Sequence, residues 1–388
     1  MNIQSTRNQY DTIVLGLGAM GSGIAYQLAR SGQRVLGLDR YHPPHVQGSS
    51  HGQSRVIRQA YGDDPRYVPF IHRTFAGWHE LERLSGETLL VKSGLLLMGT
   101  PDSELIVSTT KSVQQHGVEC EYLERAEISR RWPVLQTDSD MCGVFEPSGG
   151  ILRVETCMET LLTEATNHGA TLHFNEPVET WQANNGRVEI HTSRTTYHAR
   201  HLVIAAGPWC SPVLADLNLP LWIERHVQLW FQPKSQPQRF APDCCPIFAW
   251  QHDDNGATFY GFPDLGQGIK VAHHHSGQST DPDTLNRALD DGDLADVRQL
   301  LQRFVPDANG DLLNHDVCMY TNTPDLNFLV DFHPQHPEVL IVGGCSGHGF
   351  KFAPVMGEIA RDLLTGKPME TGREMFHLNR FGTPGPSA

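Results

Sequence analysis

Short apolar, β-branched runs alternate with amphipathic segments along most of this chain, a pattern typical of an α/β protein. Near the N-terminus, residues 12–15 predict a buried strand, residues 19–29 a helix and residues 34–38 a second strand. The other predicted helices cover residues 67–84, 154–169, 284–304 and 353–364. The other predicted buried strands cover residues 170–174, 201–207 and 339–344.

Two β-rich stretches interrupt this alternation. Residues 87–99 and 143–146 are apolar and rich in strand formers, and we expect them to form a sheet separate from the first. Strand character returns at residues 222–231 and 258–262. The segments on either side of Asn184-Asn185-Gly186 predict a β-hairpin, because this composition favours a tight turn.

The segments typical of a doubly wound sheet therefore occur at the start, in the middle and at the end of the chain. This order predicts a mixed α/β (α+β) fold with two domains. The first is a discontinuous, Rossmann-like nucleotide-binding domain formed by residues 8–92, 148–218 and 322–388. The second is a β-sheet-rich substrate domain formed by residues 93–147 and 219–321.

Gly16, Gly18 and Gly21 form a G-x-G-x-x-G sequence directly after the first predicted strand. Small residues there let the backbone approach a pyrophosphate, which the N-terminus of the following helix stabilises. Asp39 ends the second predicted strand, 18 residues after Gly21, where an acid accepts hydrogen bonds from a ribose hydroxyl. These features predict dinucleotide binding and leave NAD and FAD open. Asp39 argues against NADP because it would repel a 2′-phosphate.

Composition narrows the classes of partner. The 30 Lys and Arg residues against 44 Asp and Glu residues give a net charge of −14, which argues against broad binding to nucleic acid or anionic membranes. The polar N-terminus lacks the apolar core of a secretory signal, and no run of about 18 apolar residues occurs. The 8 cysteines show no CxxC pair or zinc spacing, and consecutive histidines at 273–275 would point to opposite faces of a strand. We therefore expect a cytoplasmic protein without a metal site.

Four motifs give the chain a more specific resemblance. They are GLGAMG at residues 16–21, SHGQSRVIRQAYG at 50–62, DVCMYTNTPD at 316–325 and SGHGFKF at 346–352. In this order the chain resembles the monomeric sarcosine oxidase and N-methyltryptophan oxidase family, within the D-amino-acid-oxidase-like flavoproteins. The likeness extends from about residue 10 to about residue 380.

The resemblance implies FAD rather than NAD, with the flavin joined covalently to a cysteine that falls on Cys318. Without the resemblance, Cys318 would be read as a small buried apolar residue. A thiolate must form for the attachment, so nearby positive charge should favour it. The other cofactor-binding residues that the resemblance implies are Val178, Gly207, Gly344, Gly347, His348, Gly349 and Lys351.

The resemblance also implies a site for the substrate carboxylate. In the family an arginine and a lysine hold this group, and they match Arg58 and Lys351. A guanidinium fork and an ammonium can hold a carboxylate in one orientation. The alternative is that both are solvated surface cations. Tyr260, His274 and Tyr320 match residues that line the substrate cavity.

Three cations match catalytic positions near the flavin ring. Lys270 takes the place of the lysine that activates dioxygen, where a positive charge lowers the cost of placing an electron on O2. The alternative for Lys270 is a strand lysine with its amine in water. His51 and Arg55 match residues that stabilise the reduced flavin. The chain departs from the family here, since Ser50 stands where many members have a second histidine and Gln53 where they often have an acid.

Together these residues imply a FAD-dependent oxidase of secondary, N-methyl amino acids such as sarcosine or N-methyl-L-tryptophan. Its products would be an aldehyde, a primary amino acid and H2O2. The resemblance implies a monomer whose partners are a small amino-acid substrate and O2. The alternatives are a dehydrogenase of the same fold with another acceptor, an oxidase of Amadori compounds or cyclic imino acids, and a flavin-binding protein without catalysis. Lys270 argues against the dehydrogenase, and the pair of Arg58 and Lys351 argues against the non-catalytic protein.

Overall fold

The computed structural model describes residues 8–252, 257–275, 277–367 and 373–382. Two large sheets organise this part of the chain, one of eight strands and one of nine, and a sheet of three strands accompanies them. The eight-stranded sheet contains β1 (Gln9–Leu15), β2 (Val35–Leu38), β9 (Thr171–His173), β10 (Val178–Asn184), β11 (Arg187–Thr192), β12 (Thr196–Ile204), β19 (Leu329–His333) and β20 (His336–Gly343).

The centre of the eight-stranded sheet is parallel. β1 lies between β2 and β12, with Leu15 opposite Leu38 on one side and Ile204 on the other, and β20 continues the parallel order beyond β12. These strands are apolar because both of their faces are buried. β10 and β11 form the predicted hairpin, with Asn185 and Gly186 at positive φ in its turn.

Helices α2 (Ala19–Arg30), α6 (Val154–Asn167), α3 (Val68–Ser85) and α9 (Ala353–Leu364) pack beside this sheet. Helix α2 crosses α9 at two glycines. A Cβ on Gly23 would lie 2.2 Å from the carbonyl oxygen of Ala353, and one on Gly357 would lie 2.2 Å from that of Gly23. The two backbones therefore approach more closely than side chains would permit, and α2 is held firmly after the glycine-rich turn.

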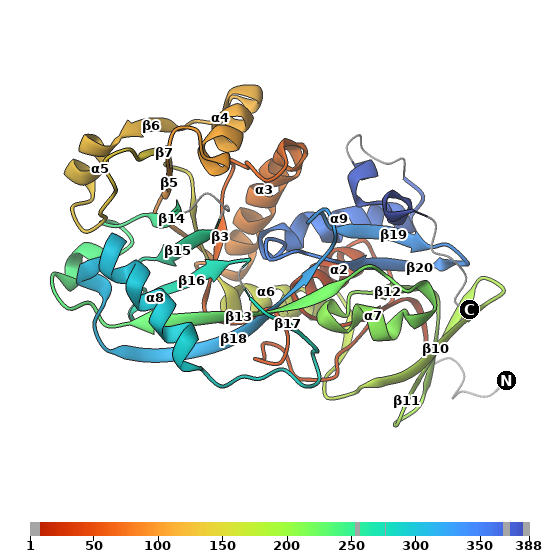
Figure 1. Ribbon diagram of the computed structural model, residues 1–388. Helices are drawn as coiled ribbons and strands as arrows, with labels where there is room; N and C mark the ends of the chain where they lie inside the picture. The colour runs from red at the N-terminus through yellow and green to blue at the C-terminus, as the bar shows by residue number, and fades with distance from the viewer. Residues whose placement is uncertain (1–7, 253–256, 276, 368–372, 383–388) are drawn as a thin grey trace.

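The nine-stranded sheet lies to the left of the first sheet in Figure 1. It contains β5 (Leu95–Gly99), β6 (Glu121–Glu124), β7 (Cys142–Glu146), β13 (Trp222–Phe231), β14 (Ile247–Gln251), β15 (Thr258–Phe262), β16 (Ile269–His274), β17 (Ser279–Thr280) and β18 (Leu312–Asn322). The pairing of β5 with β7 confirms the separate sheet predicted for those residues. β13 and β18 run antiparallel along most of their length, which places His226 opposite Cys318.

The small sheet, β3 (Ser54–Ile57), β4 (Leu90–Lys92) and β8 (Gly150–Arg153), completes the strands. The prediction of one strand-rich run over residues 87–99 was therefore incomplete, because β4 and β5 belong to different sheets. Further α-helices are α4 (Glu104–His116), α5 (Arg125–Arg131) and α7 (Cys210–Val213).

Helix α8 (Asp291–Phe304) begins later than predicted, since residues 284–290 are not helical. A reciprocal capping box explains its start: the Asp290 side chain accepts from the Asp293 backbone N–H, and the Asp293 side chain accepts from that of Asp290. Within the described ranges, no helix combines the length and apolar character needed to cross a membrane.

Candidate functional site

A cavity of ≈ 590 Å³ opens at the carboxyl ends of β1, β2 and β12 and extends to β18. The residues that line it include most of the predicted cofactor-binding positions: Gly16, Gly18, Asp39, Val178, Gly207, Cys318, Gly344, Gly347 and Gly349. We call it the larger cavity. Open α/β sheets bind nucleotides at this edge, so the location agrees with the glycine motif.

The glycine motif forms a tight turn at one end of the larger cavity. Gly16 has a φ of 90°, and a Cβ on Gly21 would lie 1.7 Å from the carbonyl oxygen of Gly16. The turn therefore requires these two glycines and brings the N-terminus of α2 to the cavity. Asp39 accepts hydrogen bonds from the backbone N–H of Leu17 at 2.7 Å and of Tyr41 at 2.8 Å, which fixes its carboxylate at the cavity wall.

Cys318 lies at the other end of the larger cavity, buried on β18. Its thiol lies 3.5 Å from the carbonyl oxygen of Ser49 and 3.6 Å from a guanidinium nitrogen of Arg55. Burial alone would raise the pKa of the Cys318 thiol, but His51 and Arg55 lower this pKa to about 7. A substantial fraction of thiolate is therefore present at neutral pH, as a nucleophilic cysteine requires.

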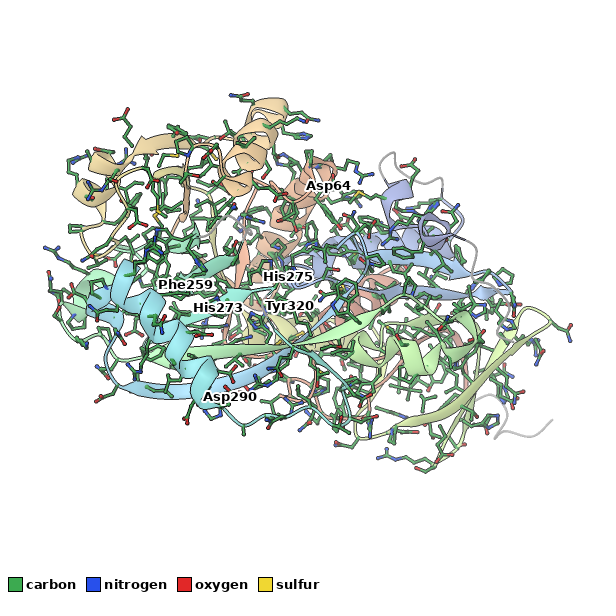
Figure 2. The ribbon with its side chains drawn as sticks, viewed as in Figure 1. Asp64, Phe259, His273, His275, Asp290 and Tyr320 are labelled. Atoms are coloured by element: carbon green, nitrogen blue, oxygen red, sulfur yellow. The ribbon has the colours of Figure 1, made fainter. Side chains whose placement is uncertain are left out.

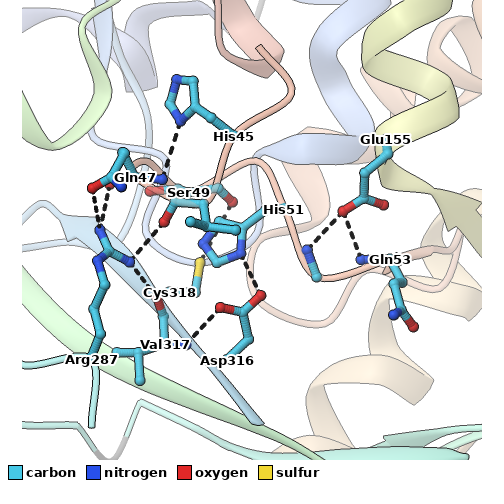
Figure 3. A network of polar contacts seen from close by, with 12 residues as sticks. His45, Gln47, Ser49, His51, Gln53, Glu155, Arg287, Asp316, Val317 and Cys318 are labelled. Carbon is cyan, nitrogen blue, oxygen red and sulfur yellow. Dashed lines mark hydrogen bonds and ion pairs between the residues drawn. The ribbon is translucent and has the colours of Figure 1, made fainter. Parts of the chain in front are cut away.

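His51 lies beside Cys318, although it is not itself one of the residues that line a cavity (Figure 3). Its Nδ1 is 2.8 Å from Oδ2 of Asp316. Burial lowers the pKa of His51, but Asp316 and Cys318 outweigh it and raise this pKa to about 9. The imidazole is therefore a cation at neutral pH. The sequence analysis expected His51 near the flavin ring and did not identify Asp316, which lies two residues before Cys318 on the same strand.

A second cavity, of ≈ 160 Å³, adjoins the larger one, and we call it the smaller cavity. The two share the lining residues Arg55, Tyr320, Gly347 and Phe350. The smaller cavity brings together all five residues predicted to bind substrate: Arg58, Tyr260, His274, Tyr320 and Lys351. Much of its remaining wall is apolar and consists of Val56, Leu95, Leu97, Leu105, Ile247, Ala249 and Phe262.

Arg58 forms an ion pair with Asp63, a residue that the sequence analysis missed. Only 15% of the Arg58 side chain is exposed, whereas 48% of the Asp63 side chain is, so the carboxylate reaches into the cavity opening. Burial opposes ionisation of Asp63, but Arg58 holds its pKa well below the usual range. The guanidinium also lies over the ring of Tyr61, 4.9 Å from its centroid. This pair shows that the Arg58 guanidinium can hold a carboxylate in this place.

Lys351 lies near the same pair, buried in the short helix Phe350–Phe352. Its Nζ donates to the carbonyl oxygen of His348 at 2.7 Å and lies 5.3 Å from the ring centroid of Tyr61. Burial and the charge of Arg58 lower the pKa of Lys351 to about 7, while Asp63 raises it. Lys351 is therefore poised between its neutral and charged forms, and an anion beside it would favour the charged form.

The structure places His348 at the smaller cavity, although the sequence analysis assigned it to the cofactor. Its Nδ1 contacts the Tyr61 hydroxyl and its Nε2 is 2.9 Å from the carbonyl oxygen of Leu326. Glycines 347 and 349 turn toward the larger cavity on either side of it, which explains the difference. Burial and the charge of Lys351 lower the pKa of His348 to about 4, so the ring is neutral at pH 7.

A group of buried aromatic side chains forms the polar wall of the smaller cavity, near the centre of the molecule where Tyr320 is labelled in Figure 2. The Tyr320 hydroxyl is 2.9 Å from Nε2 of His226 and 3.3 Å from Nδ1 of His274. The Tyr260 hydroxyl is 3.3 Å from the same His226 nitrogen. Burial lowers the pKa of His226 to about 3. This histidine, which the sequence analysis missed, therefore joins the two tyrosines as a neutral ring.

Lys270 is buried behind the small sheet and lines neither cavity. Its Nζ donates to the carbonyl oxygens of Gly52 at 2.7 Å and Ser54 at 3.0 Å, and lies 5.3 Å from the ring centroid of Trp230. The alternative of an amine in water is therefore excluded. Burial and the charge of Arg55 lower the pKa of Lys270 well below its usual value. A negative charge nearby would be needed to favour its cationic form.

The residues of the larger cavity fit FAD. One end offers the glycine turn, a helix N-terminus and a carboxylate for a ribose, which suit the dinucleotide half. The other end offers a thiol of lowered pKa next to the cations Arg55 and His51. The small lining residues between these ends leave room for an extended cofactor.

Comparison with known proteins agrees with this site. A family model described as FAD dependent oxidoreductase, DAO, matches residues 11–363. A monomeric sarcosine oxidase of Streptomyces avermitilis is 42% identical over 362 residues, which cover 92% of this chain and 94% of the relative. An N-methyl-L-tryptophan oxidase of Salmonella newport is 36% identical over 375 residues, 96% of this chain and 99% of the relative. The predicted family resemblance is confirmed.

Among solved structures, NikD, described as an unusual amino acid oxidase essential for nikkomycin biosynthesis, matches with a TM-score of 0.83. The match covers 95% of this chain and 97% of that chain at 24% sequence identity. At this identity the likeness shows the fold. The fold class predicted from the sequence, a Rossmann-like FAD-binding fold with a second β-rich part, is confirmed.

Proposed function

The chain belongs to the DAO family of FAD-dependent oxidoreductases, and we propose that it oxidises secondary, N-methyl amino acids with O2 as acceptor. Sarcosine and N-methyl-L-tryptophan are the substrates that the relatives' names suggest. The products are an aldehyde, a primary amino acid and H2O2. The observation that carries the proposal is the smaller cavity, whose buried cations Arg58 and Lys351 adjoin the larger cavity beside Tyr320.

FAD would be held by the glycine turn and Asp39 at one end and by Cys318 at the other. When bound, FAD would supply the redox chemistry, which is to accept two electrons from the substrate C–H bond and pass them to O2. We assign Cys318 as the covalent attachment point because its thiol lines the cavity and its pKa of about 7 provides the thiolate that attachment needs.

Arg58 and Lys351 bind and orient the substrate carboxylate. The carboxylate takes the place of Asp63 on Arg58, and its charge favours the protonated form of Lys351. Because the two cations approach from different segments of the chain, they fix the carboxylate's orientation as well as its position. The apolar wall of Leu95, Leu97 and Ile247 excludes water from the rest of the substrate.

Tyr260, Tyr320 and His274 line the same cavity and would face the substrate as neutral groups. Burial raises the pKa of Tyr320 well above its usual value and lowers that of His274 well below it. Neither side chain therefore brings a charge that would repel or trap the amine. Oxidation requires an amine with a free electron pair, and a wall of uncharged hydrogen-bonding groups favours that form.

Lys270 acts in the reaction with O2. Its buried Nζ donates to the carbonyl oxygen of Ser54 on β3, and the residue that follows on that strand, Arg55, lines both cavities. The cationic form of Lys270 is favoured when negative charge develops nearby, and it then lowers the cost of reducing O2 by one electron.

A substrate panel tests the proposal. Sarcosine, N-methyl-L-tryptophan, N-methyl-L-alanine and the matching primary amino acids are mixed with purified protein in air, and H2O2 and aldehyde are measured. We expect N-methyl amino acids to yield both products in equal amounts and primary amino acids to yield little. Oxidation with an artificial electron acceptor but without H2O2 would instead indicate a dehydrogenase.

A further inference from the structure

We propose that Asp316 is a positioning residue for flavin attachment, which holds His51 as a cation against the Cys318 thiol through a hydrogen bond. The inference rests on the proposed covalent link at Cys318 and adds a carboxylate that acts on the thiol through His51. Figure 3 shows Asp316, His51 and Cys318 together, with the His51 ring between the carboxylate and the sulfur.

Strand geometry brings the three groups together. Asp316 and Cys318 are two residues apart on β18, so their side chains leave the same face of the strand. His51 approaches that face from the loop before β3, and its Nδ1 lies 2.8 Å from Oδ2 of Asp316. The intervening residue, Val317, points away, and its carbonyl oxygen accepts a hydrogen bond from Arg287 at 3.0 Å.

Arg287 ties the two segments into one unit. Besides Val317, its guanidinium donates to the carbonyl oxygens of Val46 at 2.7 Å and Gln47 at 2.9 Å. The loop that carries His51 and the strand that carries Asp316 and Cys318 are thus held by one side chain. The distance between Asp316 and His51 is therefore fixed by the surrounding structure and does not depend on a flexible surface contact.

Burial makes the charge of Asp316 effective. His51 is 2% exposed, and its Nε2 has no hydrogen-bond partner in the described structure. Without a partner, burial would leave the ring neutral. The Asp316 carboxylate, together with Cys318, outweighs burial and raises the pKa of His51 to about 9, and the resulting cation helps to lower the pKa of Cys318 to about 7. Burial raises the pKa of Asp316, but the hydrogen bond and the charge of His51 outweigh it, so this pKa lies below its usual value.

The other charged or titratable side chains around this group act differently. They are Arg55 on β3, Lys270 on β16, Glu155 on α6, His226 on β13 opposite Cys318, and the neutral hydroxyls of Tyr260 on β15 and Tyr320 on β18, whose pKa burial raises. Arg55 lowers the pKa of Cys318 directly, and His226 is neutral. Glu155 accepts from the backbone N–H groups of Gly52 and Gln53, the two residues after His51. Among the described contacts, Asp316 is the carboxylate that hydrogen-bonds the His51 ring.

The position of Asp316 also bears on a departure noted in the sequence. Gln53 stands where the family often has an acid, and here its side chain accepts a hydrogen bond from Trp230 at 3.0 Å. Asp316 brings a carboxylate to the same loop from the opposite strand. In this chain the carboxylate beside His51 therefore comes from β18.

The attachment step balances as follows. The Cys318 thiol loses its proton, and its sulfur forms a bond to the methyl carbon of the flavin, which loses a hydrogen as a proton. The two electrons released reduce the flavin, and O2, the proposed acceptor of the enzyme, takes them up with two protons as H2O2. Asp316 and His51 contribute to the first of these events, since they favour the thiolate.

The test compares Asp316→Asn with the unchanged chain and with the control Glu155→Gln. The control removes a carboxylate that contacts the backbone of the same loop but does not contact the His51 ring. Full-length protein from riboflavin-depleted cells is mixed with FAD, and acid-stable flavin is followed with time from pH 6 to pH 9. Asparagine can still accept from His51, but it removes the charge. We expect attachment to slow roughly tenfold at pH 7. The difference should shrink toward pH 9, because His51 of the unchanged chain, with a pKa of about 9, then loses much of its own positive charge.

Other outcomes distinguish a failure of the role of Asp316 from a failure of the proposed covalent link. Equal slowing at every pH, or the same profile for Glu155→Gln, would show a structural role and overturn the inference. Asp316→Glu keeps the charge and should keep the unchanged pH profile, which guards against misfolding of the asparagine variant. If the unchanged chain forms no acid-stable flavin, the covalent proposal itself fails. If it does and Asp316→Asn matches it, only the role of Asp316 fails.

Discussion

Carboxylate binding in the smaller cavity should depend on pH through Lys351. The pKa of Lys351 is lowered to about 7 by burial and by Arg58, so its amine loses its proton near neutrality when no anion is bound. A bound carboxylate favours the proton, and binding above pH 7 must therefore be accompanied by proton uptake. The affinity of the smaller cavity for a carboxylate is therefore highest well below pH 7 and falls as the pH rises through 7.

The size of the effect follows from the fraction of protonated Lys351. With a pKa of about 7, this fraction is roughly 90% at pH 6 and roughly 3% at pH 8.5, so affinity should fall about 30-fold between them, where each pKa unit corresponds to 1.36 kcal/mol. Two neighbouring groups, Asp63 and His348, do not change their protonation state between pH 6 and pH 8.5. The pKa of Asp63 lies well below this range, and burial and Lys351 lower that of His348 to about 4.

The assay uses acetate, a carboxylate without an amine, so that ionisation of a substrate amine cannot contribute. FAD-loaded protein is titrated with acetate from pH 6 to pH 8.5, and binding is followed by the change in flavin absorbance. Lys351→Met should bind more weakly at pH 6 and lose most of the pH dependence. A flat profile for the unchanged protein, or a steep one that survives in Lys351→Met, would refute the assignment of this titration to Lys351.

Three further substitutions test separate parts of the site. Cys318→Ser should bind FAD that acid precipitation releases, whereas the unchanged protein should give a yellow pellet; acid-stable flavin in the variant would move the link to another residue. Asp63→Asn should tighten acetate binding at pH 6 about fivefold, because a partly exposed ion pair of about 1 kcal/mol no longer competes for Arg58, and weaker binding would mean that Asp63 instead orients the arginine. Lys270→Met should slow reoxidation of the flavin by O2 roughly a hundredfold and change anaerobic reduction by substrate little; comparable losses in both steps would count against its role with O2.

The sequence predicted the elements whose signals are local. The glycine turn, the buried parallel strands and the Asn185-Gly186 hairpin each follow from residue types within a short window, and the structure confirms them. The start of α8 was misplaced because the signal of its capping box, Asp290 with Asp293, is short and lies in a polar run. Strand β18 was not predicted, since its first half is exposed and polar.

The missed site residues share a different cause. Asp316 and His226 gain their roles from partners that are distant in the chain. Asp63 lies only five residues after its partner Arg58, but the two meet through an irregular loop that no helical or strand spacing predicts. No local pattern marks a carboxylate that will meet His51 across a sheet. For His348 the sequence placed the residue in the correct loop, but the direction of a side chain between two glycines depends on the backbone conformation of the loop.

The account as a whole depends on electron transfer from an N-methyl amino acid to bound FAD and from there to O2. The most direct measurement mixes the purified protein with sarcosine or N-methyl-L-tryptophan without air, records the flavin absorbance, and then admits O2. We predict that at least one of these substrates bleaches the flavin and that air restores it with formation of H2O2. Flavin that keeps its oxidised spectrum with every N-methyl amino acid tried would contradict the proposed function.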